Sequence, residues 1–301
     1  MFKFSPSLLL FLPLGLGIPL AAFSFFMAGK IAAPKSLTLE EEKAWLLSRD
    51  FYGSFDRYEK EAYVVEGKDG YKLHTVLVKN PQATDKYVIL SHGFRSNRYG
   101  DLKYLDLYME LGFHCIIYDL RGHGENAPAP ITLGQRESAD LLHLIRHTMD
   151  TYHPGMLGLH GESMGAATSL MTLKEHPPLD FVVADCSFAN LYSLIEDMSR
   201  RSPQRFLLPL VRFMVQARFG FDIKKSSPGE AVKENTLPLL LIHGEADTYI
   251  PPKHSQRIQE ANRGPVKLVM VPGAAHAQSR QTLGKEAYQS HIKAFLKEMV
   301  P

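Results

Sequence analysis

Short apolar runs rich in β-branched residues recur along this 301-residue chain, and many of them are separated by stretches with a helical pattern. The runs predicted to form strands are residues 62–65, 71–78, 87–91, 113–119, 156–160, 181–185, 237–243 and 266–271. The predicted helices are residues 97–111, 133–152, 163–176, 252–261 and 280–299. Several runs are continuously apolar, as strands buried on both faces are, and strands that alternate with helices favour a parallel sheet. The sequence therefore predicts an α/β fold with an eight-stranded, mostly parallel sheet and helices on both faces, with an antiparallel hairpin formed by the first two strands.

The composition is that of a globular protein. Hydrophobic residues make up 45 % of the sequence, and 34 Lys and Arg residues nearly balance 32 Asp and Glu residues. A chain this apolar is not disordered. The formal net charge of +2 provides no broad positive field, so we exclude nucleic acid as a partner. The two cysteines, Cys115 and Cys186, cannot form a disulfide framework, and no Cys or His spacing suggests a structural zinc site.

The amino terminus is strongly apolar. No ionisable side chain occurs from residue 4 to residue 29, and Ser24 is the only polar residue in the stretch 8–27. As a helix this stretch would span roughly 30 Å, the thickness of the hydrocarbon core of a bilayer. We therefore predict that residues 1–30 form a single-pass anchor that holds the protein at the cell membrane. Two alternatives stay open: a cleaved signal peptide, which would make the protein secreted, and an apolar helix packed on the domain.

A linker, residues 31–57, is predicted to connect this anchor to a globular domain, residues 58–301. Within that domain, residues 187–236 contain three prolines and no convincing strand. They are predicted to form a helical cap inserted after the sixth strand, over the sheet edge where open α/β sheets bind ligands. The segment 199–225 is apolar and carries seven basic residues. Either it packs over the site, or it touches an anionic membrane surface and admits lipid-like acyl esters.

The five residues 161–165, Gly-Glu-Ser-Met-Gly, carry the strongest chemical signal. They directly follow a predicted strand and begin a predicted helix. In such a turn the central serine takes a strained backbone conformation, and Gly161 and Gly165 leave the space that the turn needs to close. This context predicts that Ser163 is a nucleophile. The alternative is a small residue at a tight turn with no catalytic role.

A serine hydroxyl needs a histidine base, and that histidine needs a carboxylate that holds its tautomer. Asp247 follows the seventh predicted strand, and His276 follows the eighth. Both loops are expected at the same edge of the sheet as Ser163, which the chemistry requires. Asp185, at the end of the sixth strand, is the competing acid. We favour Asp247 because its loop adjoins the strand that leads to His276.

The oxygen of a tetrahedral intermediate needs two hydrogen-bond donors that are already in position. The backbone N–H of Met164, directly after the nucleophile, is predicted to be one of them. The backbone N–H of Phe94 is predicted to be the other, because Gly93 lets the chain after the third strand turn close to the substrate. A loop turn without a catalytic role is the alternative at Phe94.

Five motifs in this order resemble the α/β-hydrolase superfamily. They are HGF at 92–94, DLRGHGEN at 119–126, GESMG at 161–165, HGEAD at 243–247 and GAAH at 273–276. The chain is similar to the single-domain esterase, lipase and serine-aminopeptidase branch with a helical cap, and the apolar amino terminus before this domain resembles that of bacterial membrane-attached or cell-surface hydrolases. The resemblance implies an α/β-hydrolase fold, a triad of Ser163, Asp247 and His276, and an oxyanion hole made by Phe94 and Met164.

The predicted activity is hydrolysis of an acyl ester, of a small molecule or a lipid, through an acyl-serine intermediate and without a cofactor. Three alternatives stay open: a peptidase or aminopeptidase, weakly favoured by Glu196 and Asp197 in the cap; an acyltransferase; and a non-catalytic binding protein of the same fold. His143 and His147 lie one helical turn apart, with Asp140 a turn before them. We interpret these three as surface residues and predict no metal site. The sequence leaves the oligomeric state open.

Overall fold

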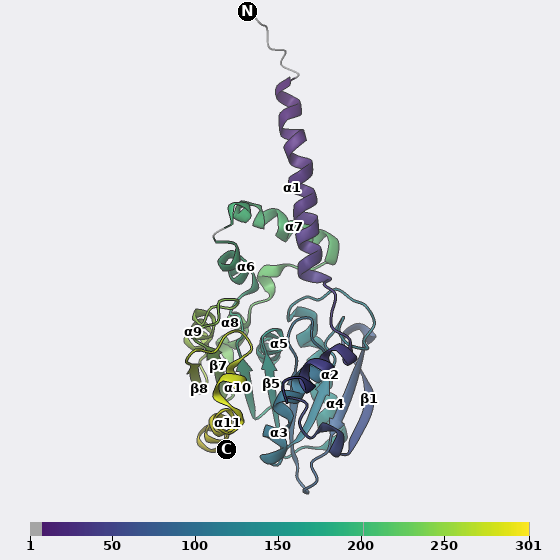
Figure 1. Cartoon of the computed structure of the whole chain (residues 1–301), viewed down its shortest axis with the longest axis vertical. Helices are drawn as coiled ribbons and strands as arrows, with labels where there is room; N and C mark the ends of the chain where they lie inside the picture. Colours follow the sequence, from purple (N-terminus) through teal and green to yellow (C-terminus); the bar gives the residue numbers. More distant parts are fainter. Residues whose placement is uncertain (1–7, 201, 301) are drawn as a thin grey trace, which may run out of the picture.

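The computed structural model of the protein describes residues 8–200 and 202–300 (Figure 1). A single sheet contains β1 (Lys60–Glu66), β2 (Lys72–Val78), β3 (Lys86–Ser91), β4 (His114–Tyr118), β5 (Met156–Glu162), β6 (Phe181–Asp185), β7 (Leu239–Gly244) and β8 (Val266–Val271). The strand order is β1-β2-β4-β3-β5-β6-β7-β8. β2 pairs antiparallel with β1 and β4, and every other neighbouring pair is parallel. The predicted fold class is confirmed, and so is the antiparallel hairpin at the edge of the sheet.

Helices cover both faces of the sheet. The helices of the chain are α1 (Leu8–Ala32), α2 (Leu39–Leu47), α3 (Leu102–Glu110), α4 (Gln135–Tyr152), α5 (Met164–Thr172), α6 (Leu191–Ser199), α7 (Leu208–Phe219), α8 (Pro228–Ala231), α9 (Lys253–Ala261), α10 (Ser279–Leu283) and α11 (Lys285–Met299). Alternate residues of a strand point to opposite faces, so β3 places Ile89 in the core with α4 and α5 and places Val88 and Leu90 in the core with α3 and α11. The central strands are therefore apolar on both faces, which is why their runs are continuous in the sequence.

Two predicted helices begin or divide differently in the structure. The helix predicted at 97–111 starts as a 3₁₀ turn, Arg98–Asp101, before α3 begins. The helix predicted at 280–299 is two helices, α10 and α11, because Gly284 between them has a φ of 81°. That backbone conformation cannot continue an α-helix, and glycine adopts it without a steric penalty.

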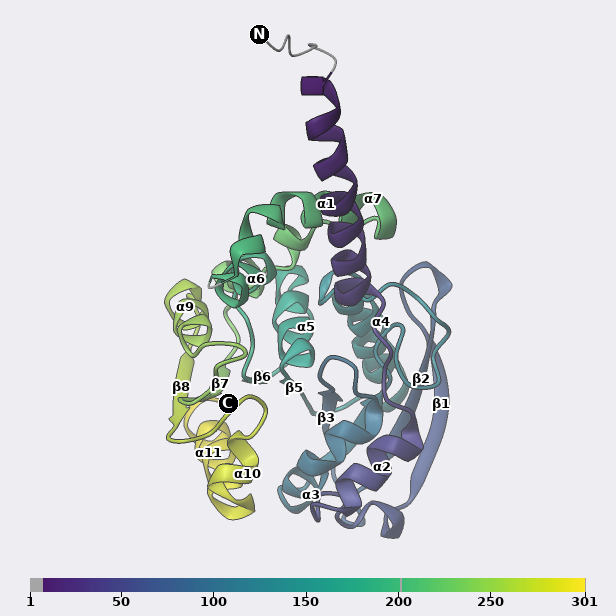
Figure 2. The same cartoon turned by 45° about the horizontal axis from the view of Figure 1, so that its top comes forward.

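The cap between β6 and β7 is helical, as predicted. α6, α7 and α8 lie in this segment together with short 3₁₀ turns, and the residues described there contain no strand. Figure 2 shows α6 and α7 at the top of the domain, with α5 between them and strands β5 and β6. Arg212 of α7 and Asp222 beyond it form a two-bonded ion pair, with donor–acceptor distances of 2.7 and 2.6 Å. This pair fastens the end of α7 to the chain that returns toward the sheet.

The structure does not support the predicted membrane anchor. Residues 1–7 lie outside the described part of the chain, and within that part no helix combines the length and apolarity that crossing a membrane requires. The last turns of α1 instead pack on the cap, where α1 runs beside α7 (Figures 1 and 2). Ser24, Ala28 and Ala32 are spaced four residues apart on one face of α1, and all three are fully buried. This part of α1 is therefore packed against protein.

The segment predicted as a linker also contacts the body of the protein. Thr38 caps α2 by accepting a hydrogen bond from the backbone N–H of Glu41, and Glu41 bonds back to the Thr38 N–H. Leu46 near the end of α2 is fully buried, and Phe51 and Phe55 join the same core as α3 and α11. This packing brings α2 to the edge of the sheet where Ser163 lies.

Candidate active site

The turn between β5 and α5 holds Ser163 in a strained conformation. Its φ is 54° and its ψ is −111°, a combination that a residue with a Cβ rarely adopts. The two glycines are required by close backbone contacts. A Cβ at Gly161 would lie 2.3 Å from the carbonyl oxygen of Gly165, and a Cβ at Gly165 would lie 1.8 Å from the carbonyl oxygen of Ser91. The turn therefore closes only with glycine at both positions, and it presents the serine hydroxyl above the end of the sheet.

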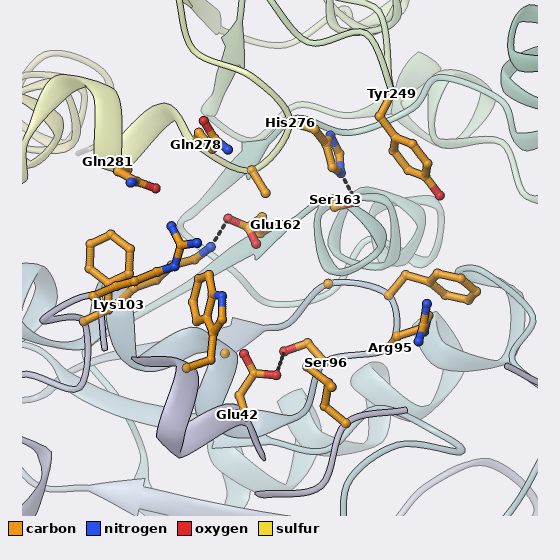
Figure 3. Close-up of a pocket in the computed structure, with 18 residues that line it drawn as sticks. Glu42, Arg95, Ser96, Lys103, Glu162, Ser163, Tyr249, His276, Gln278 and Gln281 are labelled. Atoms are coloured by element: carbon orange, nitrogen blue, oxygen red, sulfur yellow. Dashed lines mark hydrogen bonds and ion pairs between the residues drawn. The ribbon is translucent and has the colours of Figure 1, made fainter. Parts of the chain in front are cut away.

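Three side chains from three loops form a hydrogen-bonded chain. Ser163 Oγ lies 2.9 Å from His276 Nε2, and His276 Nδ1 lies 2.7 Å from Asp247 Oδ2. Figure 3 shows the imidazole of His276 directed at Ser163. β5, β7 and β8 are parallel, so the loops that follow them meet at one edge of the sheet. This topology brings together three residues that lie up to 113 positions apart.

Asp247 is buried and is held from several sides. Its Oδ1 accepts hydrogen bonds from the backbone N–H groups of Tyr249 and Ile250, at 2.9 and 2.8 Å. Its Oδ2 also lies 3.4 Å from His243 Nε2. Burial alone would raise the pKa of Asp247, but hydrogen bonds from His243 and His276 outweigh it and hold this pKa well below its usual range. The carboxylate is therefore ionised at neutral pH.

Asp185, the competing acid, has different partners. Its Oδ1 accepts a hydrogen bond from Ser279 Oγ at 2.9 Å, and its Oδ2 accepts one from Tyr288 Oη at 3.0 Å. Burial, together with the nearby charge of Glu162, raises the pKa of Asp185 to about 6. Asp247, and not Asp185, is the carboxylate against His276.

The loop after β3 brings Phe94 beside the nucleophile. β3 and β5 are neighbouring parallel strands, so Phe94 and Met164 both line a cavity that contains Ser163. Gly93 lies close to Ser163, because a Cβ built on Gly93 would be 3.8 Å from the Cβ of Ser163. The buried ring of His92 orders the loop: its Nδ1 is 2.8 Å from the Gly93 carbonyl oxygen, and its Nε2 accepts from the Leu120 N–H at 3.0 Å. Burial lowers the pKa of His92 to about 4, so this ring is neutral.

The motif at 119–126 supports the same loop without entering the site. Asp119 forms an ion pair with Arg98 and accepts from the backbone N–H groups of Arg98 and Glu125, at 2.8 and 3.0 Å. Gly124 is required there because a Cβ would lie about 2 Å from the Asp119 carboxyl group. The turn is structural, as the sequence analysis indicated.

Ser163 lies between two cavities of different character. The polar cavity, about 630 Å³, extends toward α2 and α10 (Figure 3). Its charged or polar lining residues near the serine are Glu42, Arg95, Ser96, Lys103 and Glu162. The apolar cavity, about 430 Å³, extends beneath the cap. Its apolar lining includes residues of α1, α6 and the loops after β3 and β7: Met27, Ile31, Phe94, Leu194, Ile195, Met198 and Ile250.

Sequence reasoning missed most of the charged residues that line the polar cavity. Lys103 of α3 forms an ion pair with Glu162, and the Tyr104 hydroxyl donates to the same carboxylate oxygen at 2.6 Å. Glu42 of α2 is buried and accepts from Ser96 Oγ at 3.0 Å, and burial raises its pKa. Only Glu162 carried a signal, as the residue before the serine in the motif. Tyr249 was also missed, and its ring centroid lies 4.9 Å from that of His276.

Asp140, His143 and His147, which were considered as metal ligands, form no ligand group in the described part of the chain. Asp140 is buried in a two-bonded ion pair with Arg121, at 2.8 and 2.7 Å, so it is not the surface residue we expected. His147 stacks on Tyr63, with ring centroids 5.3 Å apart. In the described part of the chain, one group has ligand atoms close enough to share an ion: Cys186, Asp247 and His276, within 4.8 Å of one another. Burial raises the pKa of the Cys186 thiol, which disfavours the thiolate that binds metals.

Comparisons with known proteins identify the family and the fold. Residues 102–300 match the prolyl oligopeptidase family. The Bacillus subtilis protein YqkD is 34 % identical over 256 residues, which cover 83 % of each chain. A lysophosphatidylserine lipase of Danio rerio, ABHD12, is 27 % identical over 180 residues, or 58 % of this chain and 46 % of the lipase. The structure of the Pyrococcus furiosus esterase Pf2001 superposes with a TM-score of 0.65 at 22 % identity, covering 84 % of this chain and 94 % of the esterase.

The family match spans well over half of the chain and includes the loops that carry Ser163, Asp247 and His276. The esterase has the same overall fold. The chain therefore belongs to the prolyl oligopeptidase family and is a serine hydrolase of the α/β-hydrolase fold.

Proposed function

We propose that this protein hydrolyses carboxylic esters that join an apolar acyl chain to a polar alcohol. One observation carries the proposal: the hydrogen-bonded chain of Ser163, His276 and Asp247 lies at the junction of an apolar and a polar cavity. A substrate ester placed with its carbonyl carbon at Ser163 Oγ would send its acyl chain beneath the cap and its alcohol part toward Lys103 and Glu162.

In the proposed acylation step, His276 Nε2 takes the proton of Ser163 Oγ as the oxygen attacks the carbonyl carbon. The imidazole becomes positively charged, and the ionised carboxylate of Asp247 on Nδ1 stabilises that charge and holds the tautomer. His276 then gives the proton to the leaving alcohol, and an acyl-serine remains. In deacylation, His276 takes a proton from water, the resulting hydroxide attacks the acyl carbon, and Ser163 Oγ regains a proton as the acid leaves.

The negative charge on the carbonyl oxygen needs donors that are in position before the reaction begins. We propose the backbone N–H groups of Phe94 and Met164 for this role. The neutral ring of His92, bonded to the Gly93 carbonyl and to the Leu120 N–H, supports the proposal because it limits the movement of the Phe94 loop. In another serine hydrolase, removal of one such donor costs about 2.7–4 kcal/mol of transition-state stabilisation.

The polar cavity favours an alcohol part that forms several hydrogen bonds. Glu42, Ser96, Lys103 and Glu162 all line it, and together they offer both acceptors and donors. The similarity to a lysophosphatidylserine lipase supports a lipid-like ester with a polar head group. Small-molecule esters with the same division into apolar and polar ends are equally compatible.

A peptidase is the second candidate. The family match and the carboxylate of Glu42 in the polar cavity favour it, because a carboxylate there could bind the ammonium group of a peptide. The nucleophile and base would be the same, and the leaving group would be an amine.

The test compares the two substrate classes on one preparation of the full chain. Labelling by a fluorophosphonate that is lost in Ser163→Ala would identify the nucleophile. Turnover of p-nitrophenyl esters, with no hydrolysis of aminoacyl p-nitroanilides above that of Ser163→Ala, would support the esterase. Hydrolysis of the p-nitroanilides that is lost in Ser163→Ala would replace it by the peptidase. Labelling that persists in Ser163→Ala would contradict the assignment of the nucleophile.

A further inference from the structure

The apolar cavity beside Ser163 has a wall that comes from outside the hydrolase body. Met27 and Ile31 lie four residues apart on α1, and both line this cavity. The facing wall is α6, which contributes Leu194, Ile195 and Met198. Ser163 and Met164 lie on the side of the sheet. An apolar chain that leaves Ser163 through this space would therefore run toward α1 and α6.

This part of α1 is fastened to the protein on two sides. The buried stripe of Ser24, Ala28 and Ala32 adjoins the face of Met27 and Ile31, and α1 lies beside α7. The guanidinium group of Arg218 in α7 donates to the Phe25 carbonyl oxygen at 3.2 Å and lies over the Phe25 ring at 4.0 Å.

At the carboxyl end of α1, the Ala32 carbonyl oxygen accepts a hydrogen bond from the Ile131 N–H at 2.8 Å. Contacts on α7 and on the loop before α4 therefore hold this wall in one place. A wall held in this way limits how far a bound chain can extend.

We infer that the carboxyl-terminal turns of α1 form the far wall of the acyl site, and that Met27 and Ile31 set the longest acyl chain that the enzyme accepts. The inference rests on the proposed function, because it assumes that an acyl group bound to Ser163 enters this cavity. It adds two specificity-determining residues from a helix that carries none of the family motifs.

The test measures the rate at which Ser163 is phosphonylated by a series of alkyl fluorophosphonates, from methyl to hexadecyl. This reaction uses the nucleophile whether the natural substrate is an ester or a peptide. Each methylene buried in an apolar site stabilises the complex by about 0.8 kcal/mol, so the wild-type rate should rise about fourfold per methylene until the cavity is full. Beyond that length the rate should level off or fall. We call this chain length the break in the profile.

Ile31→Trp adds volume to the wall and should move this break to shorter chains, with at least a tenfold loss of rate at the wild-type optimum. The methyl probe, which does not reach α1, should react within about threefold of the wild-type rate. Ala22→Trp is the matched control, because Ala22 is an exposed residue of α1 and does not line the cavity. This variant should keep the wild-type profile.

Met27→Ala is a second variant, for use if Ile31→Trp does not fold. Misfolding of Ile31→Trp would be seen as loss of its reaction with the methyl probe. Met27→Ala removes atoms from the wall and should move the break to longer chains. An unchanged break in Met27→Ala, or in an Ile31→Trp protein that still reacts with the methyl probe, would overturn the inference while the proposed function stands. If no probe reacts with the wild-type protein, the proposed function fails and the inference fails with it.

Discussion

Replacing Asp247 by asparagine changes the charge of the side chain against His276 and almost nothing else. The Asp247 Oδ1 accepts from the backbone N–H groups of Tyr249 and Ile250, and the carbonyl oxygen of an asparagine can accept the same two bonds. The NH₂ group must then take the place of Oδ2, which lies 2.7 Å from His276 Nδ1. An NH₂ group only donates, so His276 Nδ1 must accept.

The consequence is a histidine with its proton on the wrong nitrogen. With Nδ1 as acceptor, the proton of neutral His276 moves to Nε2, which lies 2.9 Å from Ser163 Oγ and can then no longer take the serine proton. Loss of the correct tautomer costs about 10⁴-fold in kcat in other triads, or about 5.5 kcal/mol of transition-state stabilisation. We expect Asp247→Asn to lower kcat for p-nitrophenyl butyrate by about 10³- to 10⁴-fold.

Asp185→Asn is the matched control, because Asp185 also ends a parallel strand at this edge of the sheet. Its carboxyl oxygens accept from the hydroxyl groups of Ser279 and Tyr288, which can turn to suit an amide. We expect kcat within about fivefold of the wild type, a change of about 1 kcal/mol. Circular dichroism and thermal unfolding would verify that both variants are folded. The reasoning is refuted if folded Asp247→Asn keeps more than about a tenth of the wild-type kcat, or if Asp185→Asn loses as much activity as Asp247→Asn.

Two further predictions concern stability. In Gly165→Ala the added methyl group would lie 1.8 Å from the Ser91 carbonyl oxygen, so we expect the free energy of unfolding in urea to fall by about 3 kcal/mol or more. Gly112→Ala, where φ is 82° and the methyl group meets no atom within 4 Å, should cost only about 1–2 kcal/mol; equal losses would contradict the steric argument. Burial lowers the pKa of His160 to about 3, so the unfolded chain takes up this proton near pH 6.5 while the folded protein does not. The contribution of His160 to stability is therefore complete above pH 6.5 and is lost as the pH falls, by about 1.4 kcal/mol per pH unit. Urea unfolding between pH 6.5 and 5 should be less pH-dependent in His160→Gln than in the wild type, and an unchanged slope would show that His160 is not buried as a neutral ring.

The strands were predictable because the central ones are buried on both faces. A strand in that position carries apolar side chains throughout, as β6 and β7 do, and the run is visible without any knowledge of its neighbours. Boundaries were less predictable. The helix expected at 280–299 breaks at Gly284, because a backbone with positive φ there starts a new helix, and glycine in a polar helical sequence does not by itself indicate a break.

The residues of the hydrogen-bonded chain could be named in advance because each follows a parallel strand, and parallel strands end at one edge of a sheet. The polar cavity could not be named in this way. Lys103 lies within α3 and Glu42 within α2. Neither residue lies in a loop directly after a strand, so its position in the sequence does not indicate that it lies near Ser163. They reach Ser163 only because packing of α2 and α3 on one face of the sheet directs both side chains to the same cavity.

The amino-terminal helix shows most clearly what the sequence determines and what the tertiary structure decides. Its apolar composition demands burial away from water, and the sequence alone establishes this. Whether lipid or protein covers a given turn depends on what lies beside it. For Ser24, Ala28 and Ala32 the covering surface is protein, because α7 runs alongside and Arg218 binds the Phe25 carbonyl. Alternation of apolar runs is a local property that sets the fold class, whereas the partner of an apolar face is a neighbour distant in the chain, which only the folded arrangement brings there.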